Sequence, residues 1–185
     1  MPIGALTGPV DPAVCALNSG PRRVDVATMF RKRGRADDLQ PTNGDRPSDV
    51  ELAQQMCRFA EIFREGSAAE GHHLDFEGAN VDRLDALADL FLRGDPSLDL
   101  VRSMTVSMGA YLGELIVRQG AGRWVFEPRS GEPGIRLSGS TLTCFPLNKV
   151  GKRLTVGPEH NFRQFYDTAV TGTLPPEARR VAGPV

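Results

Sequence analysis

The sequence has few cysteines, no long apolar run and no excess of charge of one sign, and each absence excludes a class of protein. Its three cysteines are an odd number and do not form a disulfide framework, which favours a reducing cytoplasm. No apolar run of about 18 residues occurs, so no transmembrane segment is predicted. Residues 1–8 lack the charged and apolar regions of a secretory signal. The 22 Lys and Arg residues are balanced by 23 Asp and Glu residues, whereas dedicated nucleic-acid binders need a cationic surplus. Together these absences predict a cytoplasmic location.

Motifs for metal binding and catalysis are missing as well. The sequence has no Cys-x-x-Cys or His-x-x-x-His pair, and the adjacent His72 and His73 cannot easily face one ion on a regular element. A loop-built site with Asp75 and Glu77 stays open. No Gly-x-x-x-x-Gly-Lys phosphate loop or Gly-x-Ser-x-Gly elbow is present. We therefore expect no metal, no cofactor and no catalytic residue, and an enzyme is the less favoured interpretation.

The first 47 residues are poor in aromatic side chains and rich in proline. Only Phe30 of the twelve aromatic residues lies there, together with six of the fourteen prolines. Such a segment can bury little surface against the entropy of ordering, so residues 1–47 are predicted to be a disordered or weakly ordered arm. Residues 172–185 are predicted to be a flexible, proline-rich tail. Residues 48–171 remain as a single domain.

One dense group of cations lies in the arm, at Arg31, Lys32, Arg33 and Arg35. It is a candidate tether to a membrane or to nucleic acid, and the alternative that we favour is a solvated run of linker charges. Met29, just before it, is an alternative start of the chain.

Helix signals are clear after residue 47. Ser48-Asp49-Val50-Glu51 is a capping box, in which the serine hydroxyl and the glutamate side chain each bind a backbone N–H group at the helix start. Apolar residues then recur at spacings of three and four, so a helix is predicted down to Glu65, with Gly66 as its end. Cys57 lies on this apolar stripe and is predicted to be a small buried residue.

Two further helices are predicted. Asn80 is expected to cap the second helix and Asp95 the third, which extends from Pro96 to about Arg118. The third helix is the most apolar, so we expect it at the centre of the fold. Two small residues on it would let another backbone approach closely, Gly109 and Gly113.

Beyond residue 120 the apolar pattern changes to alternation, which is typical of strands. Strands are predicted over residues 123–127, 135–137, 141–145 and 153–156. A last helix is predicted to begin at Gly157-Pro158 and to end before Gly172. Three N-terminal helices, a small antiparallel sheet and a C-terminal helix indicate an α+β fold.

The small net charge of −1 conceals a separation of charge along the chain. Residues 48–99 carry four cations and twelve acids, whereas residues 100–170 carry nine cations and five acids. We expect the acidic surface of the first two helices to lie within reach of the basic strand region. Exposed pairs of this kind contribute only about 0–1 kcal/mol each.

A group of polar and aromatic residues forms a candidate ligand site or structural ion-pair cluster: Tyr111, Glu114, Trp124, Lys149, Lys152 and Arg153. Tyr111 and Glu114 are three residues apart and share one side of the central helix. A buried Glu114 would need a cation, and the run from Lys149 to Arg153 is the expected donor. A structural ion pair is favoured over a ligand-binding glutamate, because ion-pair networks perturb carboxylates as readily as active sites do.

Several of these residues resemble the motifs of a known group. Tyr111-Leu112-Gly113-Glu114 on a helix, Gly122-Arg123-Trp124 on a strand and the segment Pro146-Leu147-Asn148-Lys149-Val150 are similar to an uncharacterised family of bacterial, actinomycete-type domains of unknown function. The resemblance covers residues 98–166 best and implies a small cytoplasmic α+β domain. Some relatives look like components of toxin–immunity or other interaction systems, which comes to this chain by analogy alone.

Two functions are consistent with these patterns. The first is a non-catalytic protein-interaction domain of immunity or adaptor type, which binds another protein through its acidic helical face or its sheet face. The alternative is a small-molecule-binding or enzymatic domain, with a pocket between the central helix and the sheet.

Overall fold

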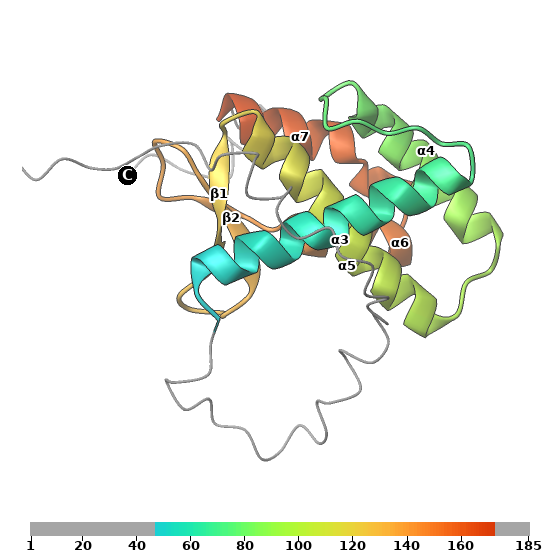
Figure 1. The fold of residues 1–185 in the computed structure, drawn as a ribbon, viewed down its shortest axis with the longest axis horizontal. Coiled ribbons are helices and arrows are strands. Elements are labelled where there is room, and N and C mark those ends of the chain that lie inside the picture. The colour runs from blue at the N-terminus through green and yellow to red at the C-terminus, as the bar shows by residue number, and fades with distance from the viewer. Residues whose placement is uncertain (1–46, 173–185) are drawn as a thin grey trace, which may run out of the picture.

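The computed structural model describes residues 47–172, where five α-helices, a 3-10 helix and a three-stranded antiparallel sheet follow one another along the chain (Figure 1). Helices lie before the sheet and after it, so the predicted α+β class is confirmed. The predicted basic tether, Arg31 to Arg35, and the alternative start at Met29 lie outside the described residues. The elements are α3 (Asp49–Ala69), α4 (Asn80–Arg93), α5 (Leu98–Arg118), β1 (Gly122–Phe126), β2 (Pro133–Leu137), β3 (Thr143–Cys144), α6 (Pro146–Thr155), η1 (Pro158–His160) and α7 (Phe162–Thr171).

The predicted capping box opens α3. The Glu51 backbone N–H donates to Ser48 Oγ at 3.2 Å, and the Ser48 backbone N–H donates to Glu51 Oε2 at 2.8 Å. The predicted end at Gly66 is wrong, because α3 continues through it to Ala69. A glycine inside a helix costs only about 1 kcal/mol, and the next turn buries Ser67 against the rest of the fold.

The predicted caps of the next two helices are also wrong by one or two residues. Asn80 is the first residue of α4, where its side-chain amide donates to the Asp75 carbonyl oxygen at 2.9 Å. Asp95 has a left-handed backbone (φ 49°), and Ser97 caps α5 instead by accepting from the Leu100 N–H at 3.3 Å. Asn, Asp and Ser side chains suit several turn positions equally well, so spacing alone does not predict which of them becomes the helix cap.

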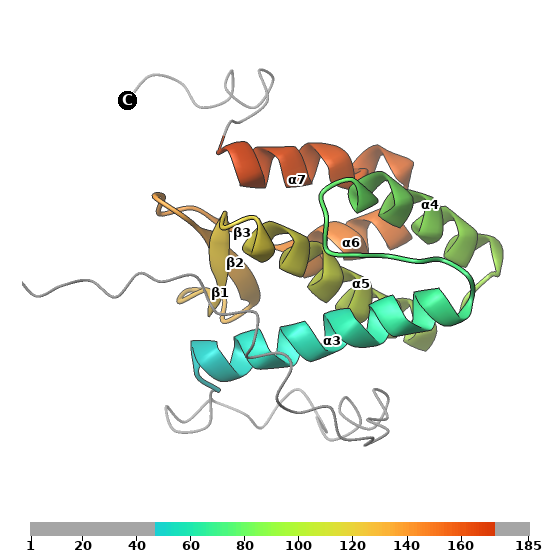
Figure 2. The ribbon, with the colours of Figure 1, turned by 45° about the horizontal axis from the view of Figure 1, so that its top comes forward.

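Helix α5 lies at the centre of the fold, as its composition predicts. It packs between α3 on one side and α6 on the other, with α4 and α7 beyond α6 and the sheet near its C-terminal end (Figure 2). A side chain at Gly109 would place its Cβ 2.9 Å from the Leu147 backbone of α6, so the predicted close approach of a second backbone occurs there. At Gly113 the close neighbour is a side chain instead, the Trp124 ring.

The sheet has the order β1-β2-β3, and the predicted hairpin is confirmed, with Trp124 opposite Ile135. Strand β3 is only two residues long, shorter than predicted. The predicted strand over residues 153–156 is wrong, because residues up to Thr155 belong to α6. Pro146 occupies the first turn of that helix, a position that suits its fixed backbone angle. Four residues of alternation are too few to exclude a helix that buries residues three and four apart.

The C-terminal helix begins later than predicted. The segment Pro158–His160 is a separate 3-10 turn, and α7 begins after Asn161, whose side chain accepts from the Gln164 N–H at 3.4 Å. Gly172 adopts the left-handed conformation (φ 66°) at the end of α7, which confirms the predicted stop.

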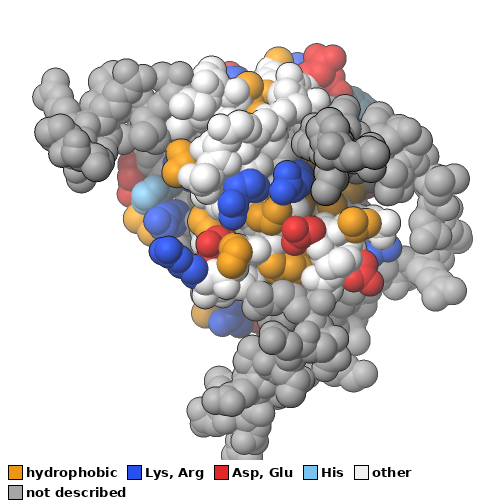
Figure 3. Space-filling view, turned by 90° about the vertical axis from the view of Figure 1, so that its left-hand side faces the viewer, with side chains coloured by type: hydrophobic (Ala, Val, Ile, Leu, Met, Phe, Trp, Pro, Cys, Tyr) orange, Lys and Arg blue, Asp and Glu red, His pale blue; other side chains and the backbone are white. Residues whose placement is uncertain are grey.

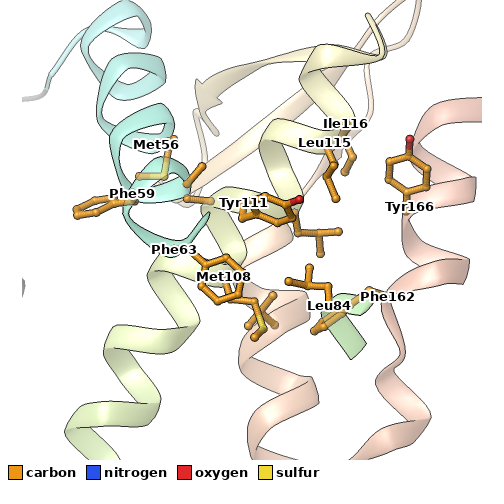
Figure 4. Close-up of a cluster of buried hydrophobic side chains, with 14 of the residues drawn as sticks. Met56, Phe59, Phe63, Leu84, Met108, Tyr111, Leu115, Ile116, Phe162 and Tyr166 are labelled. Atoms are coloured by element: carbon orange, nitrogen blue, oxygen red, sulfur yellow. The ribbon is translucent and has the colours of Figure 1, made fainter. Parts of the chain in front are cut away.

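The core lies where α3, α4, α5 and α7 meet, and side chains from all four helices interlock there (Figure 4). Cys57 is 7% exposed, so the prediction of a buried residue is confirmed. The labelled core residues are Met56, Phe59, Phe63, Leu84, Met108, Tyr111, Leu115, Ile116, Phe162 and Tyr166.

Among the described helices, α5 alone is long and apolar enough to cross a membrane, with 21 residues and a mean hydropathy of 1.2 over its best window. The expectation of no transmembrane segment rested on the lack of a continuous apolar run, whereas α5 meets the criterion by its average hydropathy. Within the fold 56% of that window is buried, and the central helix of a soluble protein meets the same criterion. The helix is therefore weak support for a membrane role.

Candidate functional site

Glu114 is buried on α5 and has two donors. Its Oε1 accepts from the indole N–H of Trp124 at 2.9 Å, and its Oε2 lies 3.4 Å from Nε of Arg118, one helical turn further along. Burial raises the pKa of Glu114, and the bonds from Trp124 and Arg118 oppose that shift. The expectation that the run from Lys149 to Arg153 supplies the cation is therefore wrong. The pattern Glu114…Arg118, four residues apart on a helix, was the signal that could have found it.

The ion pairs continue from α5 to α3. Arg118 Nη2 lies 3.3 Å from Glu61 Oε1, and Arg64 Nε donates to the same carboxylate at 2.6 Å. The Arg118 guanidinium also lies 3.4 Å above the centre of the Phe76 ring. These groups line an open depression of about 500 Å³, formed by Glu61, Arg64, Leu74, Asp75, Phe76, Glu77 and Arg118.

Tyr111 is fully buried beside this depression. Its hydroxyl donates to the backbone carbonyl of Asp75, and its ring centre lies 5.4 Å from that of Phe63 and 5.0 Å from that of Phe76. Burial raises the pKa of Tyr111 far above its ordinary value. The residue therefore holds the segment around Asp75 against α5 and stays protonated.

Arg153 has a different set of partners from the one expected. Its side chain is 3% exposed and binds two carboxylates of α4, with Nε 3.2 Å from Asp85 Oδ1 and Nη2 against Asp89. Asp85 also accepts from the backbone N–H of Phe162 at 2.8 Å. The six residues of the predicted cluster therefore divide between two places: three around α5 and β1, and three on α6.

A second, exposed pair joins α4 to α7. Arg163 donates to both carboxylate oxygens of Asp82, at 2.9 and 2.7 Å. The acids of α4 therefore meet cations of the second half of the chain, in agreement with the separation of charge along the sequence. The cations come from α6 and α7, however, and not from the strands.

Lys149 and Lys152 form no ion pair within the part of the chain that the structure describes. Lys149 is half-buried, and burial lowers the pKa of its ammonium group. Lys152 is exposed.

The space between the central helix and the sheet is filled by the Trp124 ring. A Cβ atom at Gly113 would lie 2.2 Å from Cζ2 of that ring. The depression described above lies instead between α3, the end of α5 and the loop that contains Phe76. The alternative of a ligand pocket between the central helix and the sheet therefore has no support at this place.

The outer face of the sheet carries two arginines in direct opposition. Arg123 of β1 pairs with Arg136 of β2, and Arg136 pairs in turn with Thr143 of β3. Arg136 Nε donates to Thr143 Oγ1 at 2.9 Å, whereas Arg123 is exposed. Figure 3 shows the side of the molecule that carries the sheet, where Lys and Arg side chains lie among apolar and acidic ones.

Residues 47–172 contain no metal-binding cluster and no activated cysteine. No group of three or more His, Cys, Asp or Glu side chains there is arranged to hold a metal ion. Burial raises the pKa of the Cys144 thiol to about 12, so this residue is a poor nucleophile at neutral pH. No family model, curated protein or solved structure matches this chain.

Proposed function

We propose that the chain is a non-catalytic protein-interaction domain of immunity or adaptor type, located in the cytoplasm, whose partner is another protein. The observation that carries the proposal is the exposed apolar start of α5, a helix that is buried further along. Leu98 is 73% and Leu100 50% exposed, whereas residues 108–116 are all buried. Two large apolar side chains exposed within one helical turn favour an interaction surface there.

The end of α6 enlarges this apolar surface. Helix α6 runs antiparallel to α5, because Leu147 lies against Gly109 and Gly151 against Thr105. Continued by one more turn, this register places the end of α6 beside the first turns of α5, and Val156 there is 62% exposed. Figure 1 shows these first turns of α5 extending past α3.

The charges around this surface favour a protein partner. Asp99 and Arg102 form an exposed ion pair at 3.3 Å in the first turns of α5, so the apolar side chains have a rim of both signs. Protein interfaces combine an apolar centre with a polar rim, whereas nucleic-acid interfaces are strongly cationic.

The buried charges support a structural role for the predicted cluster. Glu114, Arg153 and Tyr111 each bind a partner within the chain, and each bond joins two separate elements. A group that reacts with a substrate needs polar atoms that can reach it from a cavity. The polar atoms of these three residues are already bonded within the fold. The likeness of the Tyr111 to Glu114 segment to actinomycete-type domains stays a prediction.

The experiment compares a double substitution in α5 with a single substitution in α3, and both replace exposed apolar side chains by glutamate. Leu98→Glu with Leu100→Glu places carboxylates in the first turn of α5, where they suit the helix dipole and should leave the fold intact. Val50→Glu is the control for a carboxylate added at an exposed apolar position in a first helical turn, since Val50 is 65% exposed in the first turn of α3. Tagged full-length proteins are incubated with extract of the source cells, and retained proteins are quantified.

We expect one partner to be retained in stoichiometric amount by the wild-type protein and the Val50 variant, and to be lost by the α5 variant. Equal retention by all three proteins would contradict the proposal. Sedimentation of the wild-type protein with phosphatidylcholine vesicles, lost in the α5 variant, would assign the surface to a membrane and would also contradict it.

A second candidate function rests on the depression beside Phe76. Its arginines, Arg64 and Arg118, keep 37% and 31% of their side chains exposed, and the aromatic ring offers a flat apolar contact. The carboxylates of Glu61, Asp75 and Glu77 line the same depression, so a small molecule that carries both charges and a flat ring would suit these groups. A ligand present at 100 times its dissociation constant should add about 2.7 kcal/mol of stability, so a thermal-shift screen of zwitterionic aromatic metabolites is a direct test.

A further inference from the structure

We propose that the outer face of the sheet, built from Arg123, Arg136 and Thr143, binds an acidic segment of a partner protein. This inference rests on the proposed interaction function and names the chemistry of a second contact. It depends on the register of the sheet, on the lack of an ion pair to these arginines among residues 47–172, and on the charge of the rest of the chain.

The register places two like charges face to face. Arg123 and Arg136 are directly opposite on antiparallel strands, where Cβ atoms are about 4.5–5.5 Å apart. Like charges at such positions destabilise a sheet. Arg136 is held by its bond to Thr143 Oγ1, which fixes one side of its guanidinium and leaves the terminal nitrogens without a bond among the described residues.

The acids near the sheet are already used. The Glu127 carboxylate accepts from the backbone N–H groups of Arg129 at 2.6 Å and Ser130 at 2.8 Å, and so closes the hairpin turn. Glu132 accepts from the side-chain amide of Asn148 at 3.3 Å. Within residues 47–172 neither arginine of the opposed pair forms an ion pair, so the repulsion is not relieved inside the described fold.

A carboxylate between the two guanidinium groups would relieve this repulsion. Each guanidinium presents a planar fork of donors that fits a carboxylate in a bidentate manner. Val125 on the same face is only 6% exposed and the Phe145 ring covers Gly134, so the guanidinium groups are what this face offers a ligand. A short acidic peptide matches them.

The overall charge favours a protein segment over nucleic acid. The chain has a net charge of −1, and its first helices carry a large acidic excess. A long nucleic acid would extend over that acidic surface and be repelled by it, whereas a short acidic segment can lie against the two arginines alone.

The test uses fluorescein-labelled deca-glutamate and the full chain, with binding measured by fluorescence anisotropy at about 20 mM and about 150 mM salt. We expect the wild-type protein to bind the peptide, more weakly at the higher salt. Arg123→Glu should weaken binding about tenfold, because it removes one donor fork and adds a like charge. The same substitution converts a repulsive cross-strand pair into an attractive one, so its melting temperature should stay equal or rise.

Arg58→Glu is the matched control, because Arg58 is exposed on α3 and the change in net charge is identical. Its affinity for deca-glutamate should stay within about twofold of the wild type. An equal loss in both variants would mean that net charge alone drives binding and would overturn the proposal. No binding by the wild type would overturn it as well.

Two outcomes separate this proposal from its alternatives. Tighter binding of an oligo-dT ten nucleotides long, lost in Arg123→Glu, would assign the face to nucleic acid and overturn an acidic protein segment as the ligand. The apolar start of α5 is tested by its own variants, Leu98→Glu with Leu100→Glu. If the peptide experiment fails and the α5 variant loses the partner, the proposal for the sheet face alone is rejected. If the peptide binds as expected and the α5 variant keeps the partner, the apolar surface of α5 is rejected.

Discussion

The ion pair between α4 and α6 allows a prediction about stability. Removing its two acids should cost more free energy of unfolding than removing its arginine. Arg153 is 3% exposed, whereas the side chains of its partners are 20% exposed at Asp85 and 56% at Asp89. Replacing both acids by alanine leaves a guanidinium that can neither lose its proton nor reach water. Removing one side of a buried pair in this way costs about 3–5 kcal/mol.

The opposite substitution, Arg153→Met, should cost less. Methionine fills much of the space of the arginine stem and leaves no buried cation. Asp89 is already largely hydrated, and Asp85 keeps its bond from the Phe162 N–H at 2.8 Å. We therefore expect a loss of about 1–2 kcal/mol for Arg153→Met, clearly smaller than the loss for the double alanine variant.

Urea unfolding at neutral pH measures both losses, and thermal melts provide a second reading. For a domain of this size 1 kcal/mol corresponds to about 3–5 °C, so the melting temperature of the double alanine variant should fall by about 10–20 °C. Asp82→Asn on the same helix is the control: its partner Arg163 is 36% exposed, and the pair should be worth under about 1 kcal/mol. Equal losses from the two sides of the Arg153 pair would refute the reasoning from burial.

Two further predictions concern stability: the pH dependence due to Glu114, and the unequal effects of alanine at two helical glycines. Burial raises the pKa of Glu114 above its ordinary 4.5, so its contribution is complete below that pH and is lost as the pH rises through the folded-state pKa. The stability gap between wild type and Glu114→Gln should therefore narrow as the pH rises above about 4.5 in urea titrations, and a widening gap would show that Trp124 and Arg118 outweigh burial. Gly113→Ala would set a Cβ 2.2 Å from the Trp124 ring and should lose about 1–3 kcal/mol. Gly66→Ala has nothing within 4 Å and should gain about 0.5–1 kcal/mol in thermal melts, so equal effects of the two alanines would contradict the packing argument.

Local signals in the sequence predicted the parts of the fold that depend on neighbours in the chain. The capping box at Ser48 needs only residues three apart, and it forms as predicted. The hairpin depends on alternation within about fifteen residues, and it forms as predicted, with Trp124 of β1 opposite Ile135 of β2. The central place of α5 follows from its apolar composition, because a helix that is apolar on all sides must be surrounded.

Long-range contacts decided the parts that the sequence did not predict. Alternation over residues 153–156 suggested a strand, but burial of Val150 and Leu154 against α5 makes a helix there. The cation for Glu114 was sought in a distant basic run, although Arg118 lies one turn away and is shared with Glu61 of α3. Which of several cations meets a buried acid depends on how helices cross, and composition does not contain that information.

The ion pairs within the fold also determine which surfaces a partner can bind without breaking an internal contact. The acidic face of α4 was one of two candidate surfaces, but its carboxylates hold Arg153 and Arg163. A basic partner at that face would have to displace Arg153, and the buried guanidinium would then lose its counter-charge. The opposed arginines of the sheet, Arg123 and Arg136, have no such internal use among the described residues, so an acidic ligand there relieves a repulsion and breaks no contact. A partner at the sheet should therefore raise the melting temperature by its full binding free energy, whereas at α4 part of that free energy would be offset by the ion pairs that it breaks.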